Sequence, residues 1–184
     1  MKIIHNSGSD RVIDLIRPHL QGGHQLGCVT PTFSLFAFAE LRQALTSLER
    51  VQLLLPPHID ELEFLGGAGD RAARNRLQTR WLANQCAKWI AAKVDLRHAH
   101  GRVPQGAAVI RNAAGNTEQV VLGSFAFSTD GLGLTPGNPL SLIQGSETPD
   151  EADQLAKWFD QQWAVLRAQP ESQEALIASL QSMG

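Results

Sequence analysis

Apolar residues in the first half of the chain alternate between the spacing of buried strands and that of an amphipathic helix. Two apolar stretches, 25–30 and 51–55, have the length of buried strands, and a proline follows each of them. Between them, the apolar residues of 33–48 recur at helical spacing. A strand, a helix and a second strand in such close succession form a βαβ unit, which predicts two parallel strands joined by a right-handed crossover.

The second half of the chain predicts an antiparallel hairpin. Two β-prone stretches, 107–112 and 118–124, flank the sequence AAGN, whose glycine and asparagine suit a tight connection. Weaker patterns predict the remaining elements, which are a helix that starts after a cap at Ser7 or Ser9 and ends near His19, a helix over 70–93, a strand at 94–98 and a strand within 139–146. Together these elements predict an α/β fold with a mixed β-sheet flanked by helices.

Two helices are expected near the C-terminus. Thr148, then Pro149 at the first helical position and Glu151 three residues after the threonine, have the pattern of a capping box, which predicts the start of a helix. A weaker helical pattern follows the next proline. We therefore expect one domain over 1–168 and a C-terminal helical appendage over 169–184.

Composition is that of an ordinary soluble globular protein. The chain has 184 residues, of which 43% are hydrophobic and 18% charged, and this length is enough for one domain with a buried core. No apolar run is long enough to span a bilayer, and the N-terminal residues lack the pattern of a signal peptide. A cytoplasmic protein without a membrane partner is expected.

The net charge argues against a surface that is cationic throughout. The formal charge is −2 at pH 7, so the molecule as a whole should not be drawn to DNA or anionic lipid. Any contact with a polyanion would have to be local. The local candidate is a basic cluster, which is either a solvated helix face or a patch that contacts nucleic-acid phosphates: Arg71, Arg74, Arg76 and Arg80.

Cysteine and histidine positions do not form a metal-binding pattern. Cys28 and Cys86 each lie in an apolar stretch and are expected to be buried thiols. Four histidines at the ends of predicted elements are interpreted as surface or capping residues: His5, His19, His24 and His58. We expect neither a metal nor a cofactor. The four tryptophans lie at helical spacings that favour core packing over base stacking.

The order of the elements, and the hairpin that ends in Gly123-Ser124, resemble the phospholipase D-like superfamily, most of all its short bacterial branch found beside, or fused to, helicases and restriction enzymes. The resemblance covers roughly 1–168, with specific motifs only at 94–134. In that family one strand carries the motif H-x-K, and G-S-x-N follows the hairpin. The resemblance implies that a histidine attacks phosphorus to form a phosphohistidine, that lysine and asparagine hold the phosphate oxygens, and that two chains build one site.

The motif is degenerate in this chain. Gln105 stands where the family has its nucleophilic histidine, Ala107 replaces the lysine, and Ala126 replaces the asparagine. Ser124 is retained and is expected to be a donor near the old phosphate pocket. A glutamine amide is neither nucleophilic nor titratable, and an alanine side chain offers no hydrogen-bond donor. Phe125 also favours a packed interface, because apolar bulk opposes a dianionic phosphate.

A second placement of the motif stays open. His100 and Arg102 form an H-x-R version that would act with Ser124, and the guanidinium would bind phosphate in place of the lysine. Against this placement, both residues precede the predicted strand, and Pro104 and Gly106 interrupt the way into the hairpin.

The resemblance therefore implies a catalytically inactive phospholipase D-like domain that serves as a binding or assembly component of a DNA-processing system, such as a helicase-linked restriction, DNA-modification or defence complex. DNA and a helicase or other DNA-processing protein are the expected partners, and a homodimer is expected. The alternative is a metal-independent phosphodiesterase or nuclease that acts through a phosphohistidine at His100 in a homodimer. A third possibility is a protein-interaction module whose hairpin face is only a dimer contact.

Overall fold

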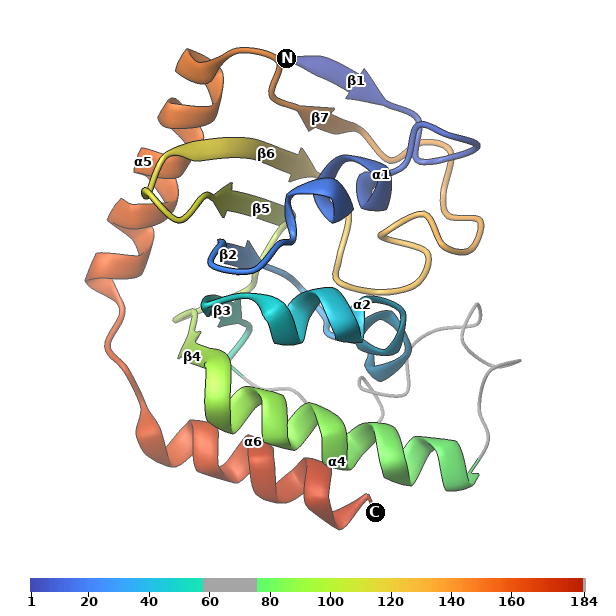
Figure 1. The fold of residues 1–184 in the computed structure, drawn as a ribbon, viewed down its shortest axis with the longest axis vertical. Helices are drawn as coiled ribbons and strands as arrows, with labels where there is room; N and C mark the ends of the chain where they lie inside the picture. Colours follow the sequence, from blue (N-terminus) through green and yellow to red (C-terminus); the bar gives the residue numbers. More distant parts are fainter. Residues whose placement is uncertain (58–75, 184) are drawn as a thin grey trace.

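A seven-stranded mixed sheet forms the centre of the protein (Figure 1). The computed structural model describes residues 1–57 and 76–183. The strands lie in the order β1-β7-β6-β5-β2-β3-β4, and they are β1 (Lys2–Ile4), β2 (Gln25–Val29), β3 (Arg50–Leu55), β4 (Val94–His98), β5 (Gly106–Arg111), β6 (Thr117–Gly123) and β7 (Ile143–Gly145). The helices are α1 (Val12–Ile16), α2 (Leu35–Ser47), α4 (Arg76–Lys93), α5 (Pro149–Val165) and α6 (Pro170–Ser182). The predicted α/β fold with a mixed sheet and flanking helices is confirmed.

The parallel half of the sheet contains the predicted βαβ unit. β2, β3 and β4 run parallel to one another, and α2 connects the first two of them. α2 begins at its observed residue because the Ser34 hydroxyl accepts hydrogen bonds from the backbone N–H groups of Phe36 and Ala37. Local capping and apolar spacing thus agree, which is why this unit is predictable from the sequence.

The antiparallel half contains the predicted hairpin. Asn112 Oδ1 accepts hydrogen bonds from the N–H groups of Ala114 and Asn116, and Gly115 has a φ of 85°, which glycine adopts without strain. β5 also pairs antiparallel with β2 and so joins the two halves. β7 pairs with β6, and β1 pairs with β7 at the edge of the sheet. β1 was not predicted, because three residues are too few to show a period.

Side chains alternate between two hydrophobic cores, one on each face of the sheet. Along β5, Ala108 and Ile110 face the larger core, which is shared with α1, α2, α4 and α6, whereas Ala107 faces a smaller core under α5. In Figure 1, α1 and α2 lie in front of the sheet and α5 runs along one side. Phe38 and Phe159 are fully buried in the two cores, and burial of such a side chain contributes about 1.5–3 kcal/mol.

The N-cap residue of α1 is Arg11, whose backbone N–H donates a hydrogen bond to Oδ2 of Asp14 over 3.1 Å. The backbone N–H of Val12 donates a hydrogen bond to Oδ1 of Asn6 over 3.0 Å. Asn6 has a left-handed backbone with a φ of 57°, which asparagine tolerates better than most residues. The predicted cap at Ser7 or Ser9 is therefore wrong.

The C-terminal helices begin close to their predicted positions. The Thr148 hydroxyl accepts a hydrogen bond from the N–H of Glu151 at the start of α5, as in the predicted capping box. α6 packs against α4 and buries Leu176 and Leu180 in the larger core. The division of the chain into a domain over 1–168 and an appendage stays a prediction.

Candidate functional site

The candidate site lies along the edge of the sheet that the ends of the strands form, and not at an outermost strand. The parallel strands β2, β3 and β4 end at this edge, and β5 begins there because it runs antiparallel to β2. The register pairs Gly106 with Gly123 and Gly123 with Ile143, so the end of β6 and the start of β7 reach the same edge. Gln105 and Ser124 lie just beyond the paired glycines. The carboxyl edge of a parallel sheet is where open α/β proteins bind ligands.

A cavity of about 520 Å³ opens at this edge, and we call it cavity 1. Gln105, Ser124 and Ala126 all line it. Ala107 does not, because its side chain is 1% exposed and faces the smaller core under α5. Ala107 instead borders a separate cavity of about 160 Å³, together with Gln105. The structure thus brings Gln105, Ser124 and Ala126 to one cavity and places Ala107 beside it.

Two glycines hold the hairpin close to its neighbours at this edge. A Cβ atom at Gly106 would collide with the carbonyl oxygen of Phe125, and a Cβ atom at Gly123 would collide with the carbonyl oxygen of Leu142. Gly123 also has a φ of 140°, a conformation that favours glycine. The retained Gly123-Ser124 pair therefore has a structural reason that does not depend on phosphate binding.

Hydrogen bonds tie the loop after β6 to the loop after β2. The buried Thr30 hydroxyl accepts a hydrogen bond from the N–H of Phe127 over 2.8 Å and donates one to the carbonyl oxygen of Thr32 over 2.5 Å. The N–H of Ser34 donates to the carbonyl oxygen of Phe127 over 2.9 Å. The rings of Phe33 and Phe127 stack with their centroids 4.8 Å apart. The groups that hold this wall of cavity 1 already have partners.

Phe125 is mainly a core residue. Its side chain is 7% exposed and belongs to the larger core, with the ring against Gly106. The expectation that its bulk forms a packed interface with a partner is wrong, because the side chain fills the interior of the domain.

Further polar side chains at cavity 1 come from segments that the sequence did not assign to a site. The residues just after β1 bring His5 and Asn6 to the cavity, and the glycine-rich loop after β6 brings Asp130. Asp130 Oδ1 accepts hydrogen bonds from the Ser128 hydroxyl over 2.7 Å and from the N–H of Gly131 over 2.9 Å. Among the described residues, no lysine or arginine lines cavity 1. No pattern in the neighbouring residues predicts that His5 lies at cavity 1, because its position depends on the long-range pairing of β1 with β7.

A second cavity, of about 290 Å³, lies next to the first and shares Pro104 and Gln105 with it; we call it cavity 2. His100 and Arg102 line cavity 2, and both side chains are exposed. Neither residue lines cavity 1. The second placement of the motif therefore does not bring His100 and Arg102 into one cavity with Ser124.

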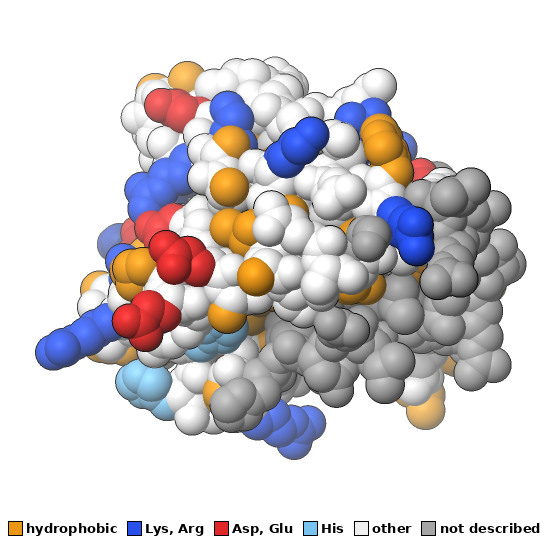
Figure 2. Space-filling view, turned by 90° about the horizontal axis from the view of Figure 1, so that it is seen from below, with side chains coloured by type: hydrophobic (Ala, Val, Ile, Leu, Met, Phe, Trp, Pro, Cys, Tyr) orange, Lys and Arg blue, Asp and Glu red, His pale blue; other side chains and the backbone are white. Residues whose placement is uncertain are grey.

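The basic cluster lies largely outside the described residues. Arg71 and Arg74 lie outside them, as does the side chain of Arg76, whereas Arg80 is exposed on α4. On the face in Figure 2, the described Lys and Arg side chains are scattered among acidic and neutral ones. Within 1–57 and 76–183, no helix is long and apolar enough to cross a membrane.

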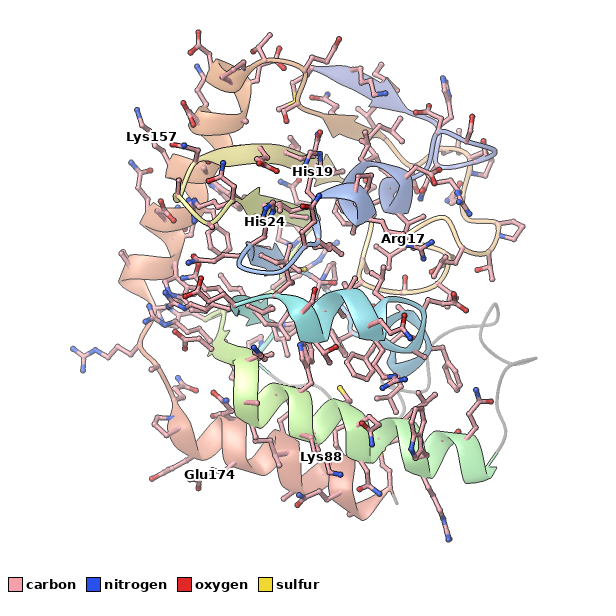
Figure 3. The ribbon with its side chains drawn as sticks, in the orientation of Figure 1. Arg17, His19, His24, Lys88, Lys157 and Glu174 are labelled. Atoms are coloured by element: carbon pink, nitrogen blue, oxygen red, sulfur yellow. The ribbon has the colours of Figure 1, made fainter. Side chains whose placement is uncertain are left out.

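Titratable groups away from the two cavities lie at the opposite end of the strands or in the core. His19 and His24 approach Glu118 there, with their Nδ1 atoms 2.9 Å and 3.8 Å from one carboxylate oxygen (Figure 3). The hydrogen bond with His19 lowers the pKa of Glu118. Cys28 and Cys86 are buried and free, as predicted, and burial raises the pKa of Cys28 to about 12. In the described part of the chain, no group of three or more His, Cys, Asp or Glu side chains could hold a metal ion.

The four tryptophans differ in burial. Trp89 and Trp163 are 4% and 7% exposed, so their predicted core packing is confirmed. Trp81 is 48% exposed, and the prediction for it is wrong. Trp158 is partly exposed on α5 and borders cavity 2.

Two solved structures resemble this chain. NucT from Helicobacter pylori is 12% identical with a TM-score of 0.49, and the match covers 86% of this chain and 92% of that one. Nuc from Salmonella typhimurium, a phospholipase D family member, is 12% identical with a TM-score of 0.45, and the match covers 84% of this chain and 88% of that one. No protein-family model and no curated protein matches the chain.

Proposed function

We propose that this chain is a catalytically inactive phospholipase D-like domain that serves as a binding or assembly component of a DNA-processing system. The order of the elements and the hairpin at 106–123 support the superfamily assignment. The system would be a helicase-linked restriction, DNA-modification or defence complex in the cytoplasm. Its other components would be DNA and a helicase or another DNA-processing protein.

One observation carries the proposal, which is the place of Gln105 at cavity 1. Gln105 matches the position from which the family's histidine attacks phosphorus, and it lies across from Ser124 at the end of the hairpin. A glutamine amide has no lone pair that can attack phosphorus near neutral pH and cannot carry a proton to a leaving group. The chain therefore lacks a nucleophile at the motif position.

The electrostatics of cavity 1 also disfavour a phosphodiester. Transfer of a phosphoryl group needs donors or cations where negative charge develops. Ala126 offers no donor, Ala107 is buried on the other face, and Asp130 adds a carboxylate to the lining. Two unit charges of the same sign 4 Å apart repel by about 4 kcal/mol at an effective dielectric constant of 20. Cavity 1 thus has no lysine or arginine among the described residues to balance the charge of a phosphate.

The test is a cleavage assay in the presence of EDTA. Single-stranded DNA, double-stranded DNA and bis(p-nitrophenyl) phosphate are incubated with the purified protein and with the matched variant Gln105→Ala. We expect no cleavage above that of the variant. Metal-independent cleavage that a substitution in the hairpin abolishes would contradict the proposal.

A second candidate function is a metal-independent phosphodiesterase or nuclease that acts through a phosphohistidine at His100 in a homodimer. The observation that favours it is that His100 and Arg102 line the same cavity. The imidazole would attack phosphorus and expel the leaving oxygen, which takes up a proton, while the guanidinium holds the phosphate; water would then release the histidine. His100→Ala should abolish activity and the trapped phosphohistidine, whereas activity that survives in His100→Ala excludes this candidate. If activity survives in His100→Ala, the same assay on His5→Ala shows whether the imidazole at cavity 1 is responsible.

We further propose a homodimer in which the two copies of 105–126 face each other across a twofold axis. Sedimentation should then report about twice the monomer mass of 20.0 kDa. Ser124→Arg, at an exposed position of this edge, should shift the protein towards monomer, because it places two cations close to the axis. A wild-type protein that is monomeric at all concentrations would contradict the dimer and leave the inactivity proposal standing.

A further inference from the structure

Cavity 2 combines apolar walls with exposed polar side chains. The apolar side chains that line it are Val29, Leu54, Val103, Trp158, Val165 and Leu166. The polar side chains that line it are His100, Arg102, Gln105 and Gln162, all of them exposed. Val165 is 70% exposed, so the cavity is accessible from solvent beside α5.

The polar side-chain groups around cavity 2 have no hydrogen-bond or ion-pair partner within the part of the chain that the structure describes. Five side chains share this property: His100, Arg102, Gln105, Trp158 and Gln162. Their donors and acceptors are therefore available to a ligand, and the Trp158 ring, which packs against the smaller core, borders the cavity.

Arg97 on β4 shows what a guanidinium with a structural role does. It donates hydrogen bonds to the carbonyl oxygens of Trp163 and Leu166 over 2.5 Å and 2.8 Å, and it lies over the Trp163 ring at 4.4 Å from the centroid. Arg97 thereby satisfies the C-terminal carbonyls of α5. Arg102 forms no such hydrogen bonds with the described residues. Free polar groups beside an apolar cavity are typical of a ligand site.

We propose that cavity 2 binds one unstacked base of a single-stranded nucleic acid. Trp158 supplies the ring on which the base stacks, Gln105 and Gln162 form hydrogen bonds with the base edge, and Arg102 pairs with an adjacent phosphate. The inference rests on the proposed function, which names DNA as a component, and adds the site at which a single strand is bound.

The polar groups favour a nucleotide over an apolar side chain of a partner protein. A leucine or phenylalanine would contact the apolar walls but would form no hydrogen bond with the two amides or the guanidinium. A base edge offers both donors and acceptors, which match the two ends of a glutamine amide, and a phosphate matches the guanidinium. Because the chain has a formal charge of −2, binding should depend on this pocket and weaken as salt rises.

The experiment measures fluorescence anisotropy of labelled single-stranded hexadeoxynucleotides in EDTA at low salt. The proteins compared are the wild type, Trp158→Ala and Trp158→Phe. Stacking on one aromatic ring accounts for roughly tenfold or more in affinity, so Trp158→Ala should raise Kd by about that factor. Trp158→Phe keeps a ring and should stay within about threefold of the wild type. This conservative variant separates loss of stacking from loss of folding.

Two controls test how much the DNA backbone and the exposed Trp81 contribute to binding. An abasic strand with the same number of phosphates should bind about tenfold more weakly than the normal strand, because it offers no base to stack. Trp81→Ala removes an indole that is 48% exposed on α4, close in sequence to the basic cluster. It should leave Kd unchanged.

Three outcomes would overturn the inference. They are no binding of the hexamers at low salt, equal binding of the abasic strand, and loss of affinity in Trp81→Ala but not in Trp158→Ala. An apolar peptide that binds in a Trp158-dependent manner, while the hexamers do not, would assign the cavity to a protein partner instead. The length of the labelled DNA is checked in the same samples. Shortened DNA would contradict the proposed inactivity, whether or not a base binds in cavity 2.

Discussion

The two cavities lie side by side at one edge of the sheet and share Gln105, yet the polar side chains around them differ in their hydrogen bonding. At cavity 1, the side chains of Asn6 and Asp130 form hydrogen bonds with backbone groups or loop side chains, and the buried Thr30 hydroxyl holds the loops behind its wall. At cavity 2, the Arg102 side chain has no partner in the described part of the chain. Several polar side chains at the larger cavity thus hold its loops in place, whereas the guanidinium at the smaller cavity is available to a ligand.

This difference explains how a site can keep its shape without its chemistry. Gly123 and the Thr30–Phe127 hydrogen bond shape cavity 1 and are also needed to close the loops over the larger core. A change at Gln105 or Ala126 leaves these contacts intact. The outline of a phosphodiesterase hairpin is therefore weaker evidence for activity than the identity of the side chains that line it.

The largest expected effect is on stability, from Thr30→Val. The substitution conserves volume and removes a fully buried hydroxyl that bonds the N–H of Phe127 and the carbonyl oxygen of Thr32. Two backbone groups lose their partner, so unfolding free energy should fall by about 2–4 kcal/mol. Thermal denaturation should show a Tm lower by roughly 5–15 °C. Thr32→Val, whose hydroxyl has no partner among the described residues, is the matched control, and an equal loss in both variants would contradict the contrast.

A smaller loss is expected from Asn6→Ala. The Asn6 amide accepts from the N–H of Val12 and donates to the carbonyl oxygen of Gly131 over 3.0 Å. Its removal should cost about 1–2 kcal/mol in chemical denaturation. Asn6→Gly should cost less than Asn6→Ala, because glycine tolerates the φ of 57°. The reverse order would show that the backbone conformation at Asn6 changes in the variants.

Arg102→Gln should change binding and leave stability alone. Its guanidinium has no partner in the described ranges, so Tm should stay within about 1 °C. Kd for a hexadeoxynucleotide should rise roughly threefold to tenfold at low salt, and the slope of log K against log salt should fall by about one. Arg80→Gln, also exposed, is the control. If Arg80→Gln has the larger effect, the basic cluster rather than cavity 2 binds the strand.

The smallest effect on Tm is expected at the end of the strands that lies away from the two cavities. This end serves as a reference for the comparison. The hydrogen bond with His19 lowers the pKa of Glu118 below its ordinary value of 4.5. A lowered folded-state pKa means that the stabilisation is present above pH 4.5 and is lost as the pH falls through the folded pKa. Glu118→Gln should lower Tm by less than about 2 °C near neutral pH, and the difference should shrink as the pH falls through the folded-state pKa of Glu118. Glu171→Gln, whose side chain has no described partner, should show no such pH dependence.

The sequence predicts those parts of the fold that depend on local chemistry. The hairpin was predicted from Gly115 and Asn116, and the start of α5 was predicted from Thr148 and Glu151. The βαβ unit follows from apolar spacing over 25–55. Each of these signals lies within a few residues of the feature that it predicts, which is why they could be found without a structure.

The parts of the site that the sequence missed depend on long-range contacts. β1 is three residues long, and only its pairing with β7 brings His5 to cavity 1. Ala107 was aligned to the motif by spacing, and the alternation of β5 turns its side chain towards α5. Trp158 was expected to be buried by helical spacing, because the sequence does not show that α5 leaves its side of cavity 2 open.

The most direct test of the contrast is an NMR titration of the isotope-labelled protein with a single-stranded tetradeoxynucleotide. We predict that the largest shift changes occur at the indole N–H of Trp158 and the side-chain amide of Gln162, while the backbone amides of Ser128 and Gly131 stay unmoved. Shift changes centred on Ser124 to Gly131, with Trp158 unaffected, would contradict the account and return cavity 1 to the role of nucleic-acid site.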